Sequence, residues 1–393
     1  MNRGCPLEQI VTRGVELGAY PGATLVVMLG QRVIADIAIG TIDGTRRVTP
    51  NTLYDLASLT KPLATASVVS ELLRSGDILL SQTVGEILGP DAGRLKSRTI
   101  HQLLTHTSGL MPHIPCYDYG LGLDAAVDAI VRSDSEPAGT IYRYSCLGYI
   151  VLAKIIKVIT GQSLDVAARA RCWDPLGLAS LTFAPSGVVA PTRSLEGPEG
   201  HPVELIGIVH DGNARGIAAG GSGDVSGNAG CFGTARDVAA FGCAVLSGEW
   251  LGMPLSKRWL TDQSQPPGHS LALFAGANPL VPKGELFGDG AGVPASCLGV
   301  PSSGFVPAAS SVVVRDWLVS GGVLSVDVAG FALPFLCLAS GLAPAAFDSL
   351  VDAVAVAADS GVAVDLWAAP GRSGYVCRPR SGSSGYFCAV SAR

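Results

Sequence analysis

The stretch Thr52-Leu53-Tyr54-Asp55-Leu56-Ala57-Ser58-Leu59-Thr60-Lys61 decides how the rest of the chain is interpreted. A helical pattern begins at Ser58 and runs to Arg74, just before Gly76. Residues three apart share one face of a helix, so the Ser58 hydroxyl and the Lys61 amine can meet. A serine hydroxyl is a poor nucleophile until a neighbouring base takes its proton, and a buried lysine amine is one such base. Positive potential at the helix start also favours negative charge that develops at Ser58.

The segments around this stretch indicate strands, then a helical middle, then a return to mixed structure. Residues 206–233 are glycine-rich, with Gly220-Gly221-Ser222-Gly223 as flexible punctuation. We therefore predict an α/β (α+β) protein with an antiparallel β-sheet flanked by helices. The sheet domain would comprise residues 1–60 plus 220–393, and a mostly helical domain would comprise residues 61–219. The expected elements are helices over Leu7–Leu17, Leu147–Ile159 and Thr234–Leu246, and strands over Ala23–Leu29 and Arg32–Ile39 joined by the two-residue hairpin loop Gly30-Gln31.

Composition excludes several classes of function. The 393 residues carry a formal net charge of −5 without a cluster of Lys and Arg, which argues against nucleic acid or an anionic membrane as partner. The ten cysteines form no CxxC pair and no zinc-ligand spacing, so neither a metal nor a cofactor is expected. Residues 328–347 are uncharged, but proline and glycine interrupt them, so no membrane span is expected. The first residues lack the apolar core of a secretory signal, which favours a cytoplasmic protein or a leader absent from this sequence.

An S-x-x-K tetrad taken alone more often marks a serine near a helix start and a lysine on a solvated face. Here five further segments follow in order, and together with the first stretch they resemble one family. That family is the serine β-lactamase and penicillin-binding-protein-like superfamily, in its class C β-lactamase-like, esterase-type branch. The resemblance covers roughly residues 7 to 285. The segments are Leu103-Leu104-Thr105-His106-Thr107-Ser108-Gly109-Leu110, Tyr142-Arg143-Tyr144-Ser145-Cys146-Leu147-Gly148-Tyr149, Val209-His210-Asp211-Gly212-Asn213-Ala214, Gly227-Asn228-Ala229-Gly230 and Gly233-Thr234-Ala235-Arg236-Asp237.

The resemblance implies a role for each matched position. Ser58 would form the acyl-enzyme, Lys61 would accept its proton, and Tyr144 would help to move protons to the leaving group. Cys146 stands at a substrate-binding position where the family usually has asparagine, and a thiol is a weaker hydrogen-bonding group than an amide. This departure favours an esterase-like enzyme over a true β-lactamase or peptidase. His106 is expected to order a loop rather than to react. The same is expected of the dipeptide His210-Asp211.

The family's third element, a Lys- or His-Thr/Ser-Gly on a strand beside the site, is not found. It is expected soon after residues 284–288, where the sequence continues Asp289-Gly290-Ala291-Gly292-Val293-Pro294. Composition changes at the same place, because residues 1–285 hold 6 Lys and 10 Glu and the last 108 residues hold neither. Residues 286–393 are therefore either a divergent C-terminal segment or the product of a frameshift, and the coincidence with the missing element favours the frameshift.

Taken together, the sequence predicts a serine hydrolase that acts on a small-molecule ester or amide. Short-chain esters are the first substrate class, and β-lactams and D-Ala-D-Ala peptides are the second. Two alternatives stay open. One is a catalytically impaired binding protein, favoured by Cys146 and the missing third element. The other is an acyltransferase that uses an acceptor other than water.

Overall fold

A computed structural model describes residues 6–17, 20–29, 31–194, 203–261, 263–266 and 269–273, together with four strands of the C-terminal part. The place expected for the missing third element, and most of residues 286–393, lie outside the described residues. The strands are β1 (Gly22–Leu29), β2 (Arg32–Gly40), β3 (Tyr54–Asp55), β4 (Thr192–Ser194), β5 (Val203–Leu205), β6 (Phe232–Gly233), β7 (Gly322–Val328), β8 (Phe335–Leu338), β9 (Tyr375–Val376) and β10 (Ala389–Val390). The α-helices are α1 (Pro6–Glu16), α2 (Ser67–Ser75), α3 (Val84–Leu88), α4 (Ile100–Leu104), α5 (Leu123–Arg132), α6 (Cys146–Thr160), α7 (Leu164–Ala168), α8 (Asp174–Leu176), α9 (Gly212–Ala218), α10 (Ala235–Ser247) and α11 (Met253–Leu260).

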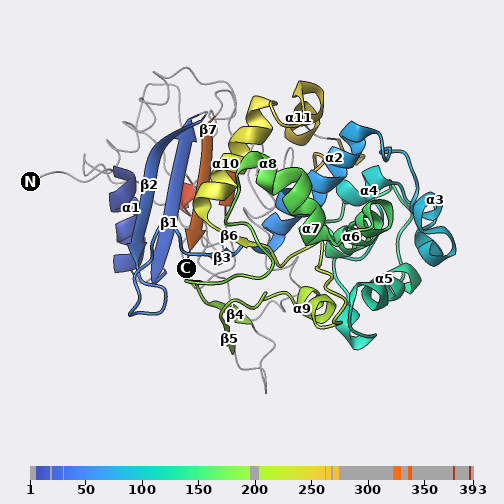
Figure 1. Ribbon diagram of the computed structural model, residues 1–393, viewed down its shortest axis with the longest axis horizontal. Helices are drawn as coiled ribbons and strands as arrows, with labels where there is room; N and C mark the ends of the chain where they lie inside the picture. The colour runs from blue at the N-terminus through green and yellow to red at the C-terminus, as the bar shows by residue number, and fades with distance from the viewer. Residues whose placement is uncertain are drawn as a thin grey trace, which may run out of the picture.

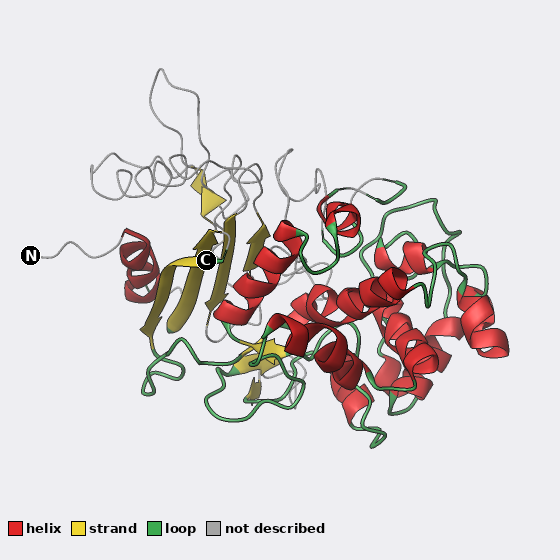
Figure 2. Ribbon diagram, turned by 45° about the horizontal axis from the view of Figure 1, so that its top comes forward, coloured by secondary structure: helices red, strands yellow, loops and turns green. Residues whose placement is uncertain are grey.

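The largest sheet in the described part is antiparallel and has the strand order β2-β1-β7-β8. The pairing of Leu29 with Arg32 closes the hairpin over two residues, as the sequence predicted. On its other edge β1 pairs along most of its length with β7, from Ala23 opposite Val328 to Leu29 opposite Gly322. Helix α1 packs on β2 and α10 packs on β1 and β7, on either side of the sheet (Figures 1 and 2). Because helices cover both faces of the sheet, β1 is apolar almost throughout instead of alternating between apolar and polar residues.

The helices α2 to α7 gather at the other end of the molecule from the sheet (Figure 1). Helix α6 lies among them and is buried along most of its length, because its sequence is apolar on nearly every side. It ends at Gly161, whose φ of 70° is the left-handed conformation that glycine adopts without steric cost. One hydrophobic cluster joins buried residues of the sheet, of α6 and of α10, so the two ends share a core. The antiparallel sheet flanked by helices is thus confirmed, and the domain boundaries stay a prediction.

The helix that follows Ser58 differs from a uniform α-helix. It starts as the short 3-10 segment η1 (Ala57–Leu59), widens into the π-type segment η2 (Lys61–Ala66) and continues as α2 to Gly76. Single π turns occur often at functional sites, because they rotate side chains out of the regular helical spacing. A second difference is α9, a helix that the sequence did not single out within the glycine-rich stretch.

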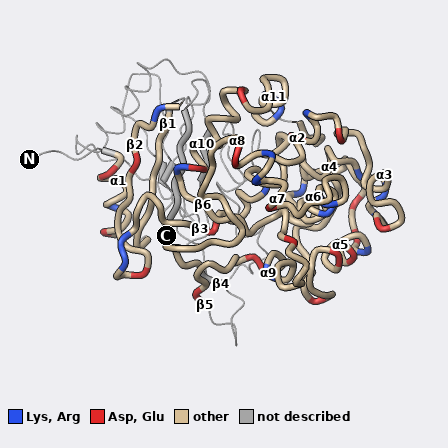
Figure 3. Tube along the Cα trace, in the orientation of Figure 1, with Lys and Arg blue, Asp and Glu red and all other residues tan. Residues whose placement is uncertain are grey.

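Charged residues of both signs are interspersed over the described chain (Figure 3). Within the same residues, no helix is both long and apolar enough to cross a bilayer. Of the uncharged stretch 328–347, the structure describes only Val328 at the end of β7 and the strand β8.

Candidate active site

A tight turn brings Ser58 to the start of its helix. Strand β3 pairs with β6, and the Leu56 N–H donates to the Cys231 carbonyl at 2.9 Å, so the chain is fixed up to this point. The next residue, Ala57, has a φ of 47°, which costs a non-glycine residue about 1 kcal/mol. Its N–H donates to Asp55 Oδ1 at 2.9 Å. Asp55 therefore holds the strained residue that immediately precedes Ser58.

Lys61 lies against Ser58, as the spacing predicted. Lys61 Nζ is 2.9 Å from Ser58 Oγ and donates to the Asn228 carbonyl at 3.1 Å. Lys61 is fully buried and Ser58 is 7% exposed. Within the described residues, no carboxylate forms an ion pair with Lys61. The amine is thus held by a hydroxyl and a carbonyl in a place that water does not reach, which is where a lysine acts as a base.

Two tyrosine rings complete the surroundings of Lys61. Its Nζ lies 4.8 Å from the centroid of the Tyr144 ring and 5.8 Å from that of Tyr149. Such contacts stabilise a cation by about 2 kcal/mol when water is excluded. Tyr144 is buried and adjoins the N-terminal end of α6, whereas Tyr149 lies within α6 and donates to the Leu104 carbonyl at 3.0 Å. The structure thus brings Tyr144 together with Ser58 and Lys61.

Cys146 opens α6 and also faces this group. Burial raises the pKa of the Cys146 thiol, and the nearby Lys61 charge, together with hydrogen bonds to Asn228 and Lys61, acts in the opposite direction. Because the pKa is raised overall, the thiol stays protonated at neutral pH and is a weak nucleophile. All five cysteines found free in the described residues are buried, as small apolar core side chains are.

His106 packs against the segment that carries Tyr144. Its ring centroid is 4.4 Å from that of Tyr144, and its Nδ1 accepts the Ser145 N–H at 3.0 Å. Burial, the neighbouring His269 and the Lys61 charge lower the pKa of His106 well below 6.5, so the ring is neutral. With Nδ1 accepting, the proton sits on Nε2. His269, 4.6 Å away centroid to centroid, was not identified from the sequence, since no motif surrounds it.

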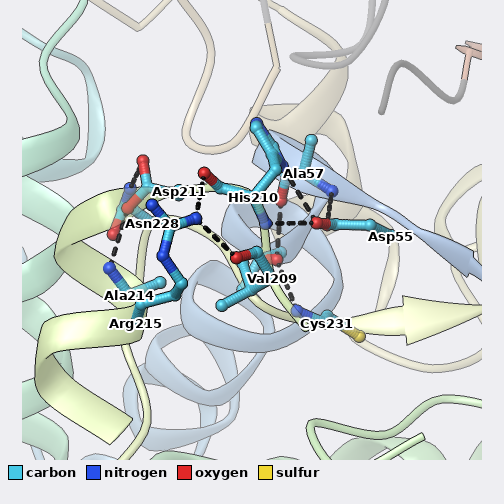
Figure 4. Close-up of polar contacts among 10 residues, drawn as sticks. Asp55, Ala57, Val209, His210, Asp211, Ala214, Arg215, Asn228 and Cys231 are labelled. Atoms are coloured by element: carbon cyan, nitrogen blue, oxygen red, sulfur yellow. Dashed lines mark hydrogen bonds and ion pairs between the residues drawn. The ribbon is translucent and has the colours of Figure 1, made fainter. Parts of the chain in front are cut away.

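The dipeptide His210-Asp211 contacts Asp55 and Asn228, which adjoin the site in the chain and through the Lys61 hydrogen bond (Figure 4). Asp55 Oδ2 accepts from both the backbone N–H and the Nδ1 of His210, each at 2.9 Å. Burial opposes charge on His210, but the attraction and hydrogen bond of Asp55 outweigh it, so the pKa of His210 is raised. Asp211 caps α9 through the Ala214 N–H at 2.8 Å and accepts from Asn228 Nδ2 at 3.2 Å. The sequence identified the dipeptide as a loop-ordering pair but not its partners Asp55 and Asn228, although both lie in quoted motifs.

In the part of the chain that the structure describes, no group of His, Cys, Asp and Glu is arranged to hold a metal ion. The groups that the structure brings together at the site are the Ser58 hydroxyl, the Lys61 amine and the Tyr144 phenol. A hydroxyl beside an amine is the arrangement that nucleophilic catalysis by a serine requires.

Comparison with known proteins places this constellation in a family. The family model described as Beta-lactamase matches residues 7–287. The chain is 34% identical over 168 residues to penicillin-binding protein 4 of Amycolatopsis lactamdurans, covering 40% of this chain and 43% of that protein. It is 26% identical over 280 residues to a putative D-alanyl-D-alanine carboxypeptidase of Escherichia coli O157:H7, covering 63% and 64%. The solved structure of EstCE1, a hydrolase with promiscuous acyltransferase activity, has a TM-score of 0.59 at 17% identity, covering 82% of this chain and 92% of that one.

The fold, and the arrangement of Ser58, Lys61 and Tyr144, are those expected of the serine β-lactamase and penicillin-binding-protein-like superfamily. The chain belongs to the Beta-lactamase family, which confirms the resemblance that the motifs indicated. It spans less than two thirds of the length of these two curated relatives. The family match ends within two residues of Glu285, the last glutamate, so the change in composition coincides with the end of the family match.

Proposed function

We propose that this chain hydrolyses small-molecule esters through an acyl-enzyme on Ser58, with Lys61 as the base. The observation that carries the proposal is the 2.9 Å contact between Lys61 Nζ and Ser58 Oγ, with the lysine fully buried. A base in hydrogen-bond contact with the hydroxyl is what a serine nucleophile needs. Both groups lie on one helix, so their separation is set by local backbone geometry.

The reaction would proceed in two halves. Lys61 takes the proton from Ser58 Oγ as this oxygen attacks the carbonyl carbon, and collapse of the tetrahedral intermediate expels the alcohol with a proton returned to it. Water then attacks the acyl-enzyme and releases the acid. Tyr144 would pass protons between Lys61 and the leaving group or the water, because its ring is adjacent to the amine. The Asn228 carbonyl would keep the amine directed at Ser58.

Cys146 supports esters as the first substrate class. The family's asparagine offers an amide that binds substrate, and a protonated thiol replaces it only weakly. β-Lactams and D-Ala-D-Ala peptides are the second class, and the names of the two curated relatives support that class. The same replacement favours one alternative function, a binding protein that acylates slowly and does not turn over.

The experiment is labelling of the purified protein with a fluorophosphonate probe, with the adduct located by peptide mass spectrometry. We expect labelling at Ser58, none in Ser58→Ala and slowed labelling in Lys61→Ala. Short-chain p-nitrophenyl esters, nitrocefin and a D-Ala-D-Ala peptide then rank the substrate classes. Labelling without turnover of any substrate would support the binding protein, and products formed with added alcohols would indicate an acyltransferase. A folded protein that does not label at Ser58 would refute the enzyme proposal.

A further inference from the structure

The adjacent residues His210 and Asp211 are each one hydrogen-bonded residue away from the Ser58–Lys61 pair. His210 contacts Asp55, which precedes Ser58 by three residues, and Asp211 contacts Asn228, whose carbonyl receives Lys61. Figure 4 shows His210 and Asp211 side by side, with Asp55 on one side and Asn228 on the other. The dipeptide is therefore linked to Ser58 through Asp55 and to Lys61 through Asn228.

On the Ser58 side, one carboxylate satisfies three donors. Asp55 Oδ1 accepts the N–H of the strained Ala57, while Oδ2 accepts two N–H groups of His210. Asp55 has no side-chain exposure and His210 has 20%, so water competes poorly for these hydrogen bonds. The position of the Ser58 turn is thus tied to the backbone at residue 210.

On the Lys61 side, hydrogen bonds fix Asn228, whose backbone carbonyl accepts from Lys61. Asn228 is fully buried and bonds Asp211 through Nδ2, while its Oδ1 accepts from Ser226 Oγ at 2.6 Å. With both ends of its amide engaged, Asn228 holds its backbone carbonyl in place. Arg215 closes the turn between the two sides by donating to the carbonyls of Val209 and His210, at 3.0 and 2.6 Å.

We propose that the pair His210-Asp211, with Asp55 and Asn228, is a positioning device that holds the Ser58 turn and the carbonyl that receives Lys61, and so orients the Ser58 hydroxyl and the Lys61 amine for the reaction. The inference rests on the proposed function of Ser58 and Lys61 and adds residues that do not themselves react. The charged groups that face His210 are Asp55, Asp211 and Arg215, and the two carboxylates outweigh the guanidinium. This balance strengthens the bond between His210 and Asp55, because a hydrogen bond from a charged donor is stronger than one from a neutral donor.

The test measures fluorophosphonate labelling of Ser58 as separate kinact and KI values in four variants. Asp55→Asn keeps the shape and an oxygen for Ala57 but turns an amide N–H toward His210. His210→Ala removes the side-chain tie, whereas His210→Asn restores an N–H at the position of Nδ1. Glu71→Gln is the matched control, since Glu71 is a buried carboxylate paired with Arg74 on the same helix, about 15 Å along its axis from Lys61.

We expect kinact to fall about 10- to 100-fold in Asp55→Asn and His210→Ala, with KI unchanged, because a misplacement near 1 Å costs about that much in rate. His210→Asn should recover most of the loss, and Glu71→Gln should match the wild type. Circular dichroism establishes that each variant is folded. A folded His210→Ala with wild-type kinact, or a His210→Asn no faster than His210→Ala, would overturn the inference while wild-type labelling at Ser58 leaves the proposed function intact. Absence of wild-type labelling would overturn both.

Discussion

Replacing Lys61 with methionine separates the role of this side chain in the reaction from its role in packing. Methionine keeps most of the length and volume of the lysine stem but has no amine. In the structure the amine makes two hydrogen bonds, to Ser58 Oγ and to the Asn228 carbonyl, and lies over the Tyr144 and Tyr149 rings. Burial is complete, so the substitution places an apolar group where solvent does not reach.

The two consequences differ in size. Loss of a general base costs about 10²–10⁴ in rate, which corresponds to about 3–5 kcal/mol in the barrier. Loss of two hydrogen bonds costs about 0.5–1.5 kcal/mol each in folding stability. That loss is offset because a polar nitrogen no longer has to be taken out of water, which costs a few kcal/mol. We therefore expect a variant labelled at least 100-fold more slowly whose free energy of unfolding is within about 2 kcal/mol of the wild type.

The assay combines fluorophosphonate labelling at Ser58 with urea unfolding followed by circular dichroism. Lys61→Arg provides a comparison, because it retains a cation that does not lose its proton. Both variants should be slow, which assigns the loss to the base rather than to the charge. A Lys61→Met protein that labels within tenfold of the wild-type rate would refute Lys61 as the base.

Three further predictions follow from the same geometry. Because the folded pKa of His210 is raised, its pairing with Asp55 stabilises the protein fully below about pH 6.5 and ever less as pH rises through the folded pKa. The stability lost in His210→Asn should therefore be larger at pH 5.5 than at pH 8.5 in urea unfolding, and a loss that grows with pH would contradict this pairing. Gly227→Ala would place a Cβ 2.0 Å from the Tyr149 carbonyl oxygen and should cost about 1–3 kcal/mol or more, seen as a lowered Tm; an unchanged Tm would show that this close approach is relaxed in solution. Cys146→Asn should raise the ratio of amide to ester turnover about tenfold, the equivalent of one added hydrogen bond to substrate, and an unchanged ratio would remove Cys146 from substrate recognition.

Local patterns account for the elements that the sequence predicted. Helix α6 required only a mostly apolar stretch closed by Gly161, and the β1–β2 hairpin required only two apolar runs two residues apart. The contact of Ser58 with Lys61 belongs to the same class, since three residues of helix fix it. Helix α9 was missed because its residues 212–218 contain two glycines, and its start depends on the cap that Asp211 provides.

The surroundings of the contact between Ser58 and Lys61 were decided by the tertiary structure. The sequence by itself determined the family, the order of the elements and the adjacency of nucleophile and amine. It did not determine that Lys61 is buried with no carboxylate partner among the described residues, that His269 packs on His106, or that Asp55 meets His210, which lies 155 positions further along the chain. Burial and long-range hydrogen bonds depend on which elements pack together, and that packing is a property of the whole core. The pattern of apolar residues within a single segment does not indicate which other segment it packs against.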